Sequence, residues 1–400
     1  MRNTLAEVLA PFPLEEFRKD FYARSPLLVR GGPDKFQHLF NWAALTHLLN
    51  VSPIPHPTMR LSLKGELLEA ADPIAVIAQC RAGATMIINT IHLFDEKIGR
   101  FAAELSTDLS EPVNVNMYLS QPSRPAFNRH YDIHDVFILQ IDGHKGWAVY
   151  DPTVNFPLFE MKFHGAVPPT EPRIETELSP GDVLYIPRGH WHEATATEDQ
   201  SLHLTVGIDA HTGIDFLTWV INELREDADC RAPFPLVLRE EERTEQAYDV
   251  RRAFLRRVQE RLTQKLTSPT TFAEYFKFKT ASDRGATRFS LPDQLLESPA
   301  RQLGLTRFVR PSYQRVVVEF DEGSSELVLT VWGKVLRLPI AAQALVSMIF
   351  ARSAFSFEEC RAAVPDLSDD ETWMVVNAFV REAIVFDAER ERWCEPTRNA

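Results

Sequence analysis

Two stretches decide the fold: NRHYDIHDVFILQIDGHKGWAVYDP, residues 128–152, and SPGDVLYIPRGHWHEA, residues 179–194. In the first, apolar runs of strand length follow the pair His130 and Asp132. In the second, Pro-Gly-Asp predicts a turn, the next residues predict a strand, and a Pro/Gly loop then leads to His192. Together the stretches predict neighbouring β-strands with polar side chains at their ends.

The polar side chains have the spacing of a metal site. His130 and Asp132 are two positions apart, and side chains at i and i+2 of a strand lie on one face. The downstream loop delivers His190 and His192. Two histidines and one carboxylate can hold non-haem Fe(II) and leave one face of the metal open. We prefer His192 as third ligand, because the loop must turn back before a strand can aim a side chain inward; His190 is the rival.

The other histidines near these stretches are expected to have ordinary structural roles. His134 shares a face with Asp132 if the strand continues, which would place it behind the ligands. For His144 and His203 we expect no metal role.

The flanking sequence predicts three regions. Short strands with Pro/Gly punctuation run from residue 111 to the SLHLTVGID segment and indicate a β-sandwich or barrel. An amphipathic helix over 93–107 precedes them. Helices over 216–227 and 249–266 follow, and the second has an apolar stripe that suits either a partner subunit or packing within the chain.

Residues 300–400 have the order of a small winged-helix-like module: strands, then helices, then a final strand. Its last helix begins at Ser368 with an acidic first turn, Asp369, Asp370 and Glu371. These acids would repel a phosphate backbone, so we expect an interaction or structural module and not a transcriptional regulator.

Composition limits the functional classes. The 400 residues include 43 Lys+Arg and 56 Asp+Glu, a net charge of −13, which argues against a general nucleic-acid binder. No apolar run reaches the roughly 18 residues of a membrane span. The four cysteines lie far apart and, with no secretion signal evident, are expected to be reduced thiols of a cytoplasmic protein.

With these motifs in view, the sequence resembles the JmjC-type Fe(II)/2-oxoglutarate oxygenases, in particular their ribosomal-oxygenase-like (cupin-4) branch. The resemblance is carried by Asn116-Met117-Tyr118, HYDIHDVFILQIDGHKGW and PGDVLYIPRGHWHE. It implies an α+β chain with a double-stranded β-helix (cupin/JmjC) barrel and N-terminal helices in residues 1–212. It further implies a helical, dimerisation-type region over 213–298 and a winged-helix-like domain over 299–400.

The resemblance also implies roles for individual residues. Fe(II) would be held by His130, Asp132 and His192. Lys145 would bind the distal carboxylate of 2-oxoglutarate, and two residues of an earlier strand would contact this co-substrate, Asn116 and Tyr118. From the residues alone, a lysine that opens a strand between apolar neighbours suits a point-charge partner for a carboxylate. The extra His134, His190 and Trp191 bear on which substrate is bound.

The implied activity is hydroxylation of a polypeptide side chain with Fe(II), 2-oxoglutarate and O2. The resemblance implies a ribosomal protein as the leading substrate, with an Arg or His residue as the target. An acidic enzyme would also attract such a basic protein. Within the same chemistry the alternative is a ribosomally synthesised peptide or another protein. A non-catalytic, metal-binding cupin is the alternative from a different class. We also expect a homodimer, no membrane association and no nucleic-acid partner.

Overall fold

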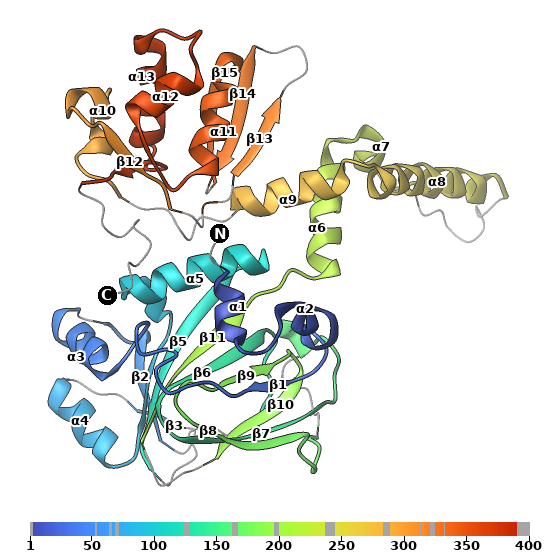
Figure 1. Ribbon diagram of the computed structural model, residues 1–400. Helices are drawn as coiled ribbons and strands as arrows, with labels where there is room; N and C mark the ends of the chain where they lie inside the picture. Colours follow the sequence, from blue (N-terminus) through green and yellow to red (C-terminus); the bar gives the residue numbers. More distant parts are fainter. Residues whose placement is uncertain are drawn as a thin grey trace. The chain divides into compact units, whose positions relative to one another are not determined.

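The computed structural model describes residues 3–52, 54–63, 66–68, 72–122, 129–161, 167–195, 200–236, 245–282, 289–311, 314, 316–320, 325–331 and 333–389. The chain divides into two compact units, Met1–Ala210 and His211–Ala400, which are described one at a time (Figure 1). Among the described helices, none combines the length and apolar character that a membrane crossing requires.

The first unit begins with short helices and strands and continues into the predicted barrel. Its early elements are α1 (Thr4–Leu9), α2 (Leu14–Glu16), the π-helical turn η1 (Phe17–Phe21), β1 (Leu27–Val29), α3 (Trp42–Val51), β2 (Met59–Leu63), β3 (Glu66–Leu68), α4 (Pro73–Arg81), β4 (Thr85–Ile88), the 3-10 turn η2 (Ile91–Leu93) and α5 (Glu96–Leu109). The barrel strands are β5 (Val113–Ser120), β6 (Asp135–Gly143), β7 (Lys145–Pro152), β8 (Ile174–Leu178), β9 (Val183–Ile186), β10 (His190–Thr195) and β11 (Ser201–Ile208).

These strands form two antiparallel sheets. The larger has the order β1-β9-β6-β11-β5-β4-β2-β3, and the smaller has the order β10-β7-β8. Side chains from both sheets meet between them in one apolar cluster that includes Val136, Ile138, Trp147 and Val149. The two packed sheets form the β-sandwich or barrel that the strand pattern predicts, and they agree with the cupin/JmjC barrel that the resemblance implies.

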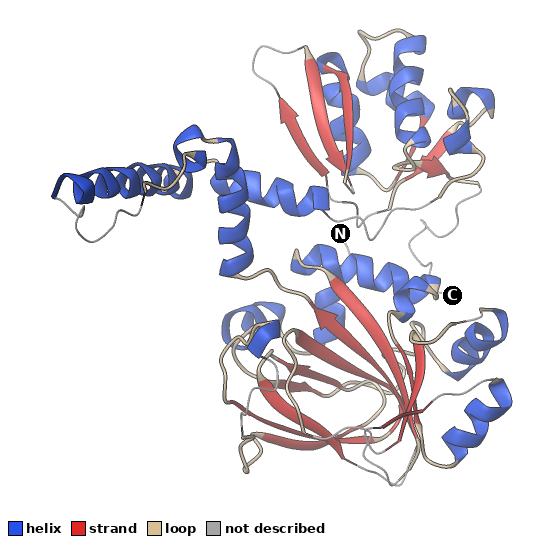
Figure 2. Cartoon of the chain, turned by 180° about the vertical axis from the view of Figure 1, so that it is seen from behind, coloured by secondary structure: helices blue, strands red, loops and turns tan. Residues whose placement is uncertain are grey.

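The opposite face of the large sheet is covered by helix α5 (Figure 2). Asp95 caps this helix by accepting a hydrogen bond from the Ile98 backbone N–H. Ile98, Phe101 and Leu105 recur at helical spacing and join the core against β5 and β11. This packing leaves the alternate side chains of β5 and β11 to face the barrel interior.

The turn before β9 is fixed by backbone geometry. Gly181 has φ +90°, and a Cβ there would lie 1.8 Å from the carbonyl oxygen of Gly32. Asp182 accepts hydrogen bonds from the backbone N–H groups of Gly31 and Ser179. The Pro-Gly-Asp motif therefore ties β9 to the chain just after β1 and sets the start of the strand that leads to His190 and His192.

The second unit begins with helices and ends with a mixed α+β module. Its elements are α6 (Gly213–Glu223), η4 (Leu224–Glu226), α7 (Ala228–Arg231), α8 (Glu245–Thr267), α9 (Thr271–Ser282), η6 (Asp293–Leu295), α10 (Pro299–Gln302), β12 (Arg307–Val309), β13 (Val316–Phe320), β14 (Glu326–Val331), β15 (Lys334–Pro339), η7 (Ile340–Ala342), α11 (Gln343–Ala351), β16 (Ala354–Ser356), α12 (Phe357–Ala363), α13 (Asp369–Arg381) and β17 (Phe386–Asp387). Its strands form two sheets, β13-β14-β15 and β16-β12-β17. Ser368 caps α13 as expected. The division at residue 298 and the winged-helix description stay predictions.

Candidate metal centre

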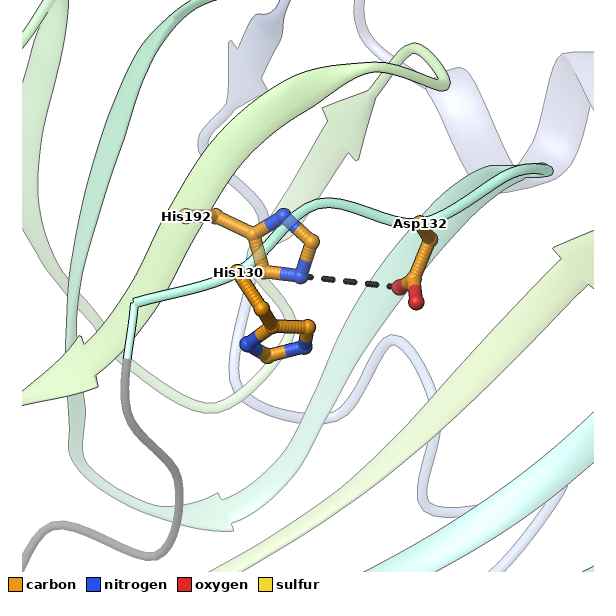
Figure 3. Close-up of side chains that lie close together, drawn as sticks. All are labelled: His130, Asp132 and His192. Atoms are coloured by element: carbon orange, nitrogen blue, oxygen red, sulfur yellow. Dashed lines mark ion pairs between the residues drawn. The ribbon is translucent and has the colours of Figure 1, made fainter. Parts of the chain in front are cut away.

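The structure brings His130, Asp132 and His192 together (Figure 3). One potential ligand atom from each residue lies within 4.8 Å of those of the other two. His192 Nε2 lies 3.5 Å from Asp132 Oδ2, and the rings of His130 and His192 have centroids 4.5 Å apart. Two imidazoles and a carboxylate this close can coordinate one divalent cation.

The means of convergence differs from the expectation of a shared strand face. Strand β6 begins only at Asp135, so His130 and Asp132 precede it. Instead, His130 forms an isolated antiparallel bridge with His192. The His130 N–H donates to the His192 carbonyl at 3.1 Å, and the His192 N–H donates back at 2.7 Å. The backbone of the third histidine itself therefore holds the first.

The same backbone network fixes Asp132 and the His192 tautomer. The Gly189 N–H donates to the carbonyl of Asp132 at 2.9 Å. His192 Nδ1 lies 3.1 Å from the His190 carbonyl oxygen, so Nδ1 carries the proton and donates it there. Nε2 is left with a lone pair toward Asp132. Burial and the neighbouring His130 lower the pKa of His192 to about 4, which keeps this ring neutral, as a metal ligand must be.

His190 lies outside the group. The register of β10 on β7 shifts between His190 and His192, and this irregularity separates the two side chains that simple alternation would place on one face. His190 is 4% exposed, and its Nδ1 has no hydrogen-bond partner among the described residues. His134 lies over β11, because a Cβ added to Gly207 would be 3.0 Å from its ring.

A charged cluster flanks the histidines, and sequence reasoning did not identify it. Arg129 Nη2 lies 2.7 Å from Glu193 Oε1, and the Tyr150 hydroxyl donates to the same oxygen at 2.7 Å. The Arg129 guanidinium also lies 3.9 Å from the centre of the Tyr150 ring. Burial alone would raise the pKa of Glu193, but these hydrogen bonds leave it below its usual value. The sequence did contain a signal for this cluster, because Arg129 directly precedes His130 and Glu193 directly follows His192.

The barrel interior next to this centre contains the predicted Lys145. It is 2% exposed, and burial lowers its pKa to about 8. Within the described part of the chain its ammonium has no ion pair and no hydrogen bond. The neighbouring wall residue on the same strand face, Trp147, has its ring centroid 6.3 Å from that of His192. Trp147 thus lies on the strand face of Lys145 and also close to His192 of the metal site.

Asn116 and Tyr118 lie on β5 with their side chains on the interior face. Asn116 Oδ1 accepts a hydrogen bond from the Thr90 N–H at 2.9 Å, which fixes its amide. Burial, and then the charge of Asp132, raises the pKa of Tyr118 to about 12. Tyr118 therefore stays protonated and lies within electrostatic reach of the metal site.

Comparison with known proteins agrees with this architecture. Residues 92–216 match the JmjC domain family model. Ribosomal oxygenase 1 of Bos taurus is 31% identical over 233 residues, which cover 54% of this chain and 34% of that protein. The bifunctional lysine-specific demethylase and histidyl-hydroxylase NO66 of Drosophila persimilis is 29% identical over 223 residues, 51% of this chain and 31% of that one. The chain thus spans about a third of the length of these relatives.

Solved structures support the fold over nearly the whole chain. YcfD, a ribosomal oxygenase from Escherichia coli, superposes with a TM-score of 0.60 at 18% identity and covers 94% of this chain and 98% of its own. Its complex with cobalt and 2-oxoglutarate gives the same TM-score and coverage.

Proposed function

We propose that this chain is an Fe(II)- and 2-oxoglutarate-dependent protein hydroxylase, because residues 92–216 match the JmjC domain family model. The observation that carries the proposal is the grouping of His130, Asp132 and His192 within 4.8 Å. This donor set fits a non-haem Fe(II) that keeps coordination positions for co-substrate and O2. When bound, iron with 2-oxoglutarate would supply the oxidising chemistry, and the protein supplies binding and orientation.

The interior wall supports the co-substrate. Lys145 is a buried cation without an acidic partner among the described residues, and a buried charge needs a counter-charge. The distal carboxylate of 2-oxoglutarate would be that partner. The structure of Escherichia coli YcfD in complex with cobalt and 2-oxoglutarate has the same fold, and cobalt commonly substitutes for iron. Asn116 and Tyr118, on the opposite wall, would orient the co-substrate.

The chain's own residues have three tasks in this proposal. His130 and His192 would each bind the metal through a ring nitrogen that carries no proton, since a proton there would block the metal. The lowered pKa of His192 keeps its ring neutral. Lys145 orients the co-substrate through its charge. The apolar cluster between the sheets excludes water from the space around these three residues.

For the substrate we propose a side chain, Arg or His, of a ribosomal protein. The names of the relatives include a ribosomal oxygenase and a histidyl-hydroxylase, and the net charge of −13 suits a basic target. A ribosomally synthesised peptide is the alternative substrate within the same chemistry. A non-catalytic, metal-binding cupin would also use the donor set, but it gives no role to the buried Lys145, which favours the oxygenase.

The proposal includes a homodimer in the cytoplasm. Helix α8 exposes Val250 by 56% and Leu255 by 55%, whereas Phe254 is buried against Phe234. A helix that leaves such apolar side chains in water suits a second copy of the chain.

Turnover of 2-oxoglutarate tests the proposed activity. The purified protein, with Fe(II) and O2, is expected to convert 2-oxoglutarate to succinate, faster with a mixture of ribosomal proteins, and the D132A variant is expected not to. No succinate from the Fe(II)-loaded wild-type protein, with or without ribosomal proteins, would favour the non-catalytic cupin.

A further inference from the structure

Three nitrogen donors lie on buried side chains of the barrel interior. They belong to Lys145, Trp147 and His203, whose side chains are 2%, 6% and 4% exposed. Trp147 Nε1 and His203 Nδ1 are both buried without a hydrogen-bond partner there. Buried polar atoms are nearly always satisfied in folded proteins, so two unpartnered ring nitrogens next to the charge of Lys145 indicate a ligand that brings acceptors.

His203 lies opposite the other two. It is on β11, whose even-numbered side chains Leu202 and Leu204 face the helical layer, and its odd-numbered position puts it on the interior face. Its ring is nearly perpendicular to that of Trp147, at a centroid distance of 5.7 Å. Burial and the charge of Lys145 lower the pKa of His203 to about 3. The ring is therefore neutral and carries one N–H donor beside the lysine.

The orientation of this imidazole is fixed in advance. The register of β11 on β5 sets His203 directly across from Tyr118. Their rings stack with centroids 5.1 Å apart and an angle of 5° between the planes. A donor held in place by stacking loses little freedom when it binds a ligand.

We propose that His203 is a co-substrate-binding residue, whose imidazole N–H donates to the same carboxylate of 2-oxoglutarate that Lys145 binds. This inference rests on the proposed function. A carboxylate has two oxygens and about four lone-pair sites, so it can accept from the ammonium and the imidazole at once. A ligand with a neutral end would leave the charge of Lys145 unpaired. The pair would thus select a dicarboxylate.

Two substitutions separate hydrogen bonding from packing. His203→Phe keeps an aromatic ring over Tyr118 and removes the donor, whereas His203→Asn keeps an N–H donor and removes the stack. The measurement is the dissociation constant of 2-oxoglutarate by calorimetry on Co(II)-loaded protein. We expect H203F to weaken binding by roughly ten- to hundredfold, as for a lost hydrogen bond to a charged group. H203N should bind at least threefold more tightly than H203F.

The inference is overturned if H203F binds within threefold of the wild type, or if H203N binds no better than H203F. The matched control is His144→Phe, at the half-buried turn between β6 and β7, which should leave the affinity unchanged. If the wild-type protein binds no 2-oxoglutarate, the proposed function fails instead.

A second measurement does not depend on how the variants fold. In wild-type protein with 15N-labelled histidine, the His203 ring nitrogens should shift when 2-oxoglutarate is added, and one N–H should become protected from exchange with water. An unchanged His203 signal at saturating 2-oxoglutarate would also overturn the inference.

Discussion

The ion pair between Arg129 and Glu193 joins the two segments of the metal centre at the residues next to its histidines. Arg129 Nη2 lies 2.7 Å from Glu193 Oε1, and each residue is the chain neighbour of one of the two bridged histidines. The bridge aligns His130 with His192, and the ion pair resists their separation. Groups that orient ligands in this way typically change metal affinity by 10- to 100-fold when removed, roughly.

We therefore expect Glu193→Gln to weaken metal binding about tenfold, because the amide loses the charge that holds Arg129. The measurement is Co(II) affinity by competition with a chelator. Glu175→Gln, an exposed position on the neighbouring strand β8, is the matched control. Equal affinities for E193Q and E175Q would show that the bridge alone positions the ligands.

Replacing each of the two loop histidines by alanine, one at a time, tests the choice of the third metal ligand. His192→Ala should reduce metal affinity by more than about a hundredfold, since a direct ligand is lost. His190→Ala should keep metal binding, because His190 lies outside the three-residue group. If His190→Ala loses the metal and His192→Ala keeps it, our ligand assignment is wrong.

Removing the buried lysine should have opposite effects on binding and stability. Lys145→Met should abolish measurable 2-oxoglutarate binding but raise the free energy of unfolding of the ligand-free protein by about 2–3 kcal/mol at pH 7. The reason is that burial lowers the pKa of Lys145 from 10.5 to about 8, so the charged form is disfavoured in the folded state.

The sign of the pH effect follows from this shift. Below pH 8 the lysine is charged in both states and the penalty is complete; between pH 8 and 10.5 the folded state releases its proton and the penalty disappears. The stabilisation by Lys145→Met should therefore shrink over that range, as measured by denaturant unfolding.

If K145M still binds 2-oxoglutarate, the partner of the carboxylate is another cation. Arg60, whose charge acts on Tyr118 and whose Nε has no partner among the described residues, is then the candidate.

The same pKa predicts how co-substrate affinity depends on pH. As pH rises from 7 to 9, loss of the Lys145 charge should weaken 2-oxoglutarate binding by about tenfold. Lys145→Arg stays charged throughout and should give a flat profile. A flat profile in the wild-type protein would mean that the lysine does not bind the carboxylate.

Sequence motifs predicted the parts of the site that lie close together in the chain. The strand after His130 and Asp132, the turn at Gly181 and the loop to His192 follow from local turn chemistry and apolar runs. The structure brings these three side chains together, although a backbone bridge and not a shared strand does so. The motifs thus predict that His130, Asp132 and His192 lie close together, whereas the bridge that causes this depends on pairing between segments far apart in the chain.

Features that depend on strand register could not be predicted in this way. His203 was assigned an ordinary structural role, because its stacking on Tyr118 exists only through the pairing of β11 with β5. The pair Arg129–Glu193 needs the bridge between segments far apart in sequence.

The sequence also does not predict helix α4 or the β2–β3 hairpin, because their short apolar runs lack clear periodicity.

Intact-mass spectrometry of ribosomal proteins tests the central claim most directly. The comparison is between cells that lack this gene and express either the wild-type protein or the H192A variant. Our account predicts that one ribosomal protein is heavier by one oxygen atom only with the wild-type protein, and peptide mapping then locates the modified Arg or His. If every ribosomal protein has the same mass in both strains, the claim that this chain hydroxylates a ribosomal protein is contradicted.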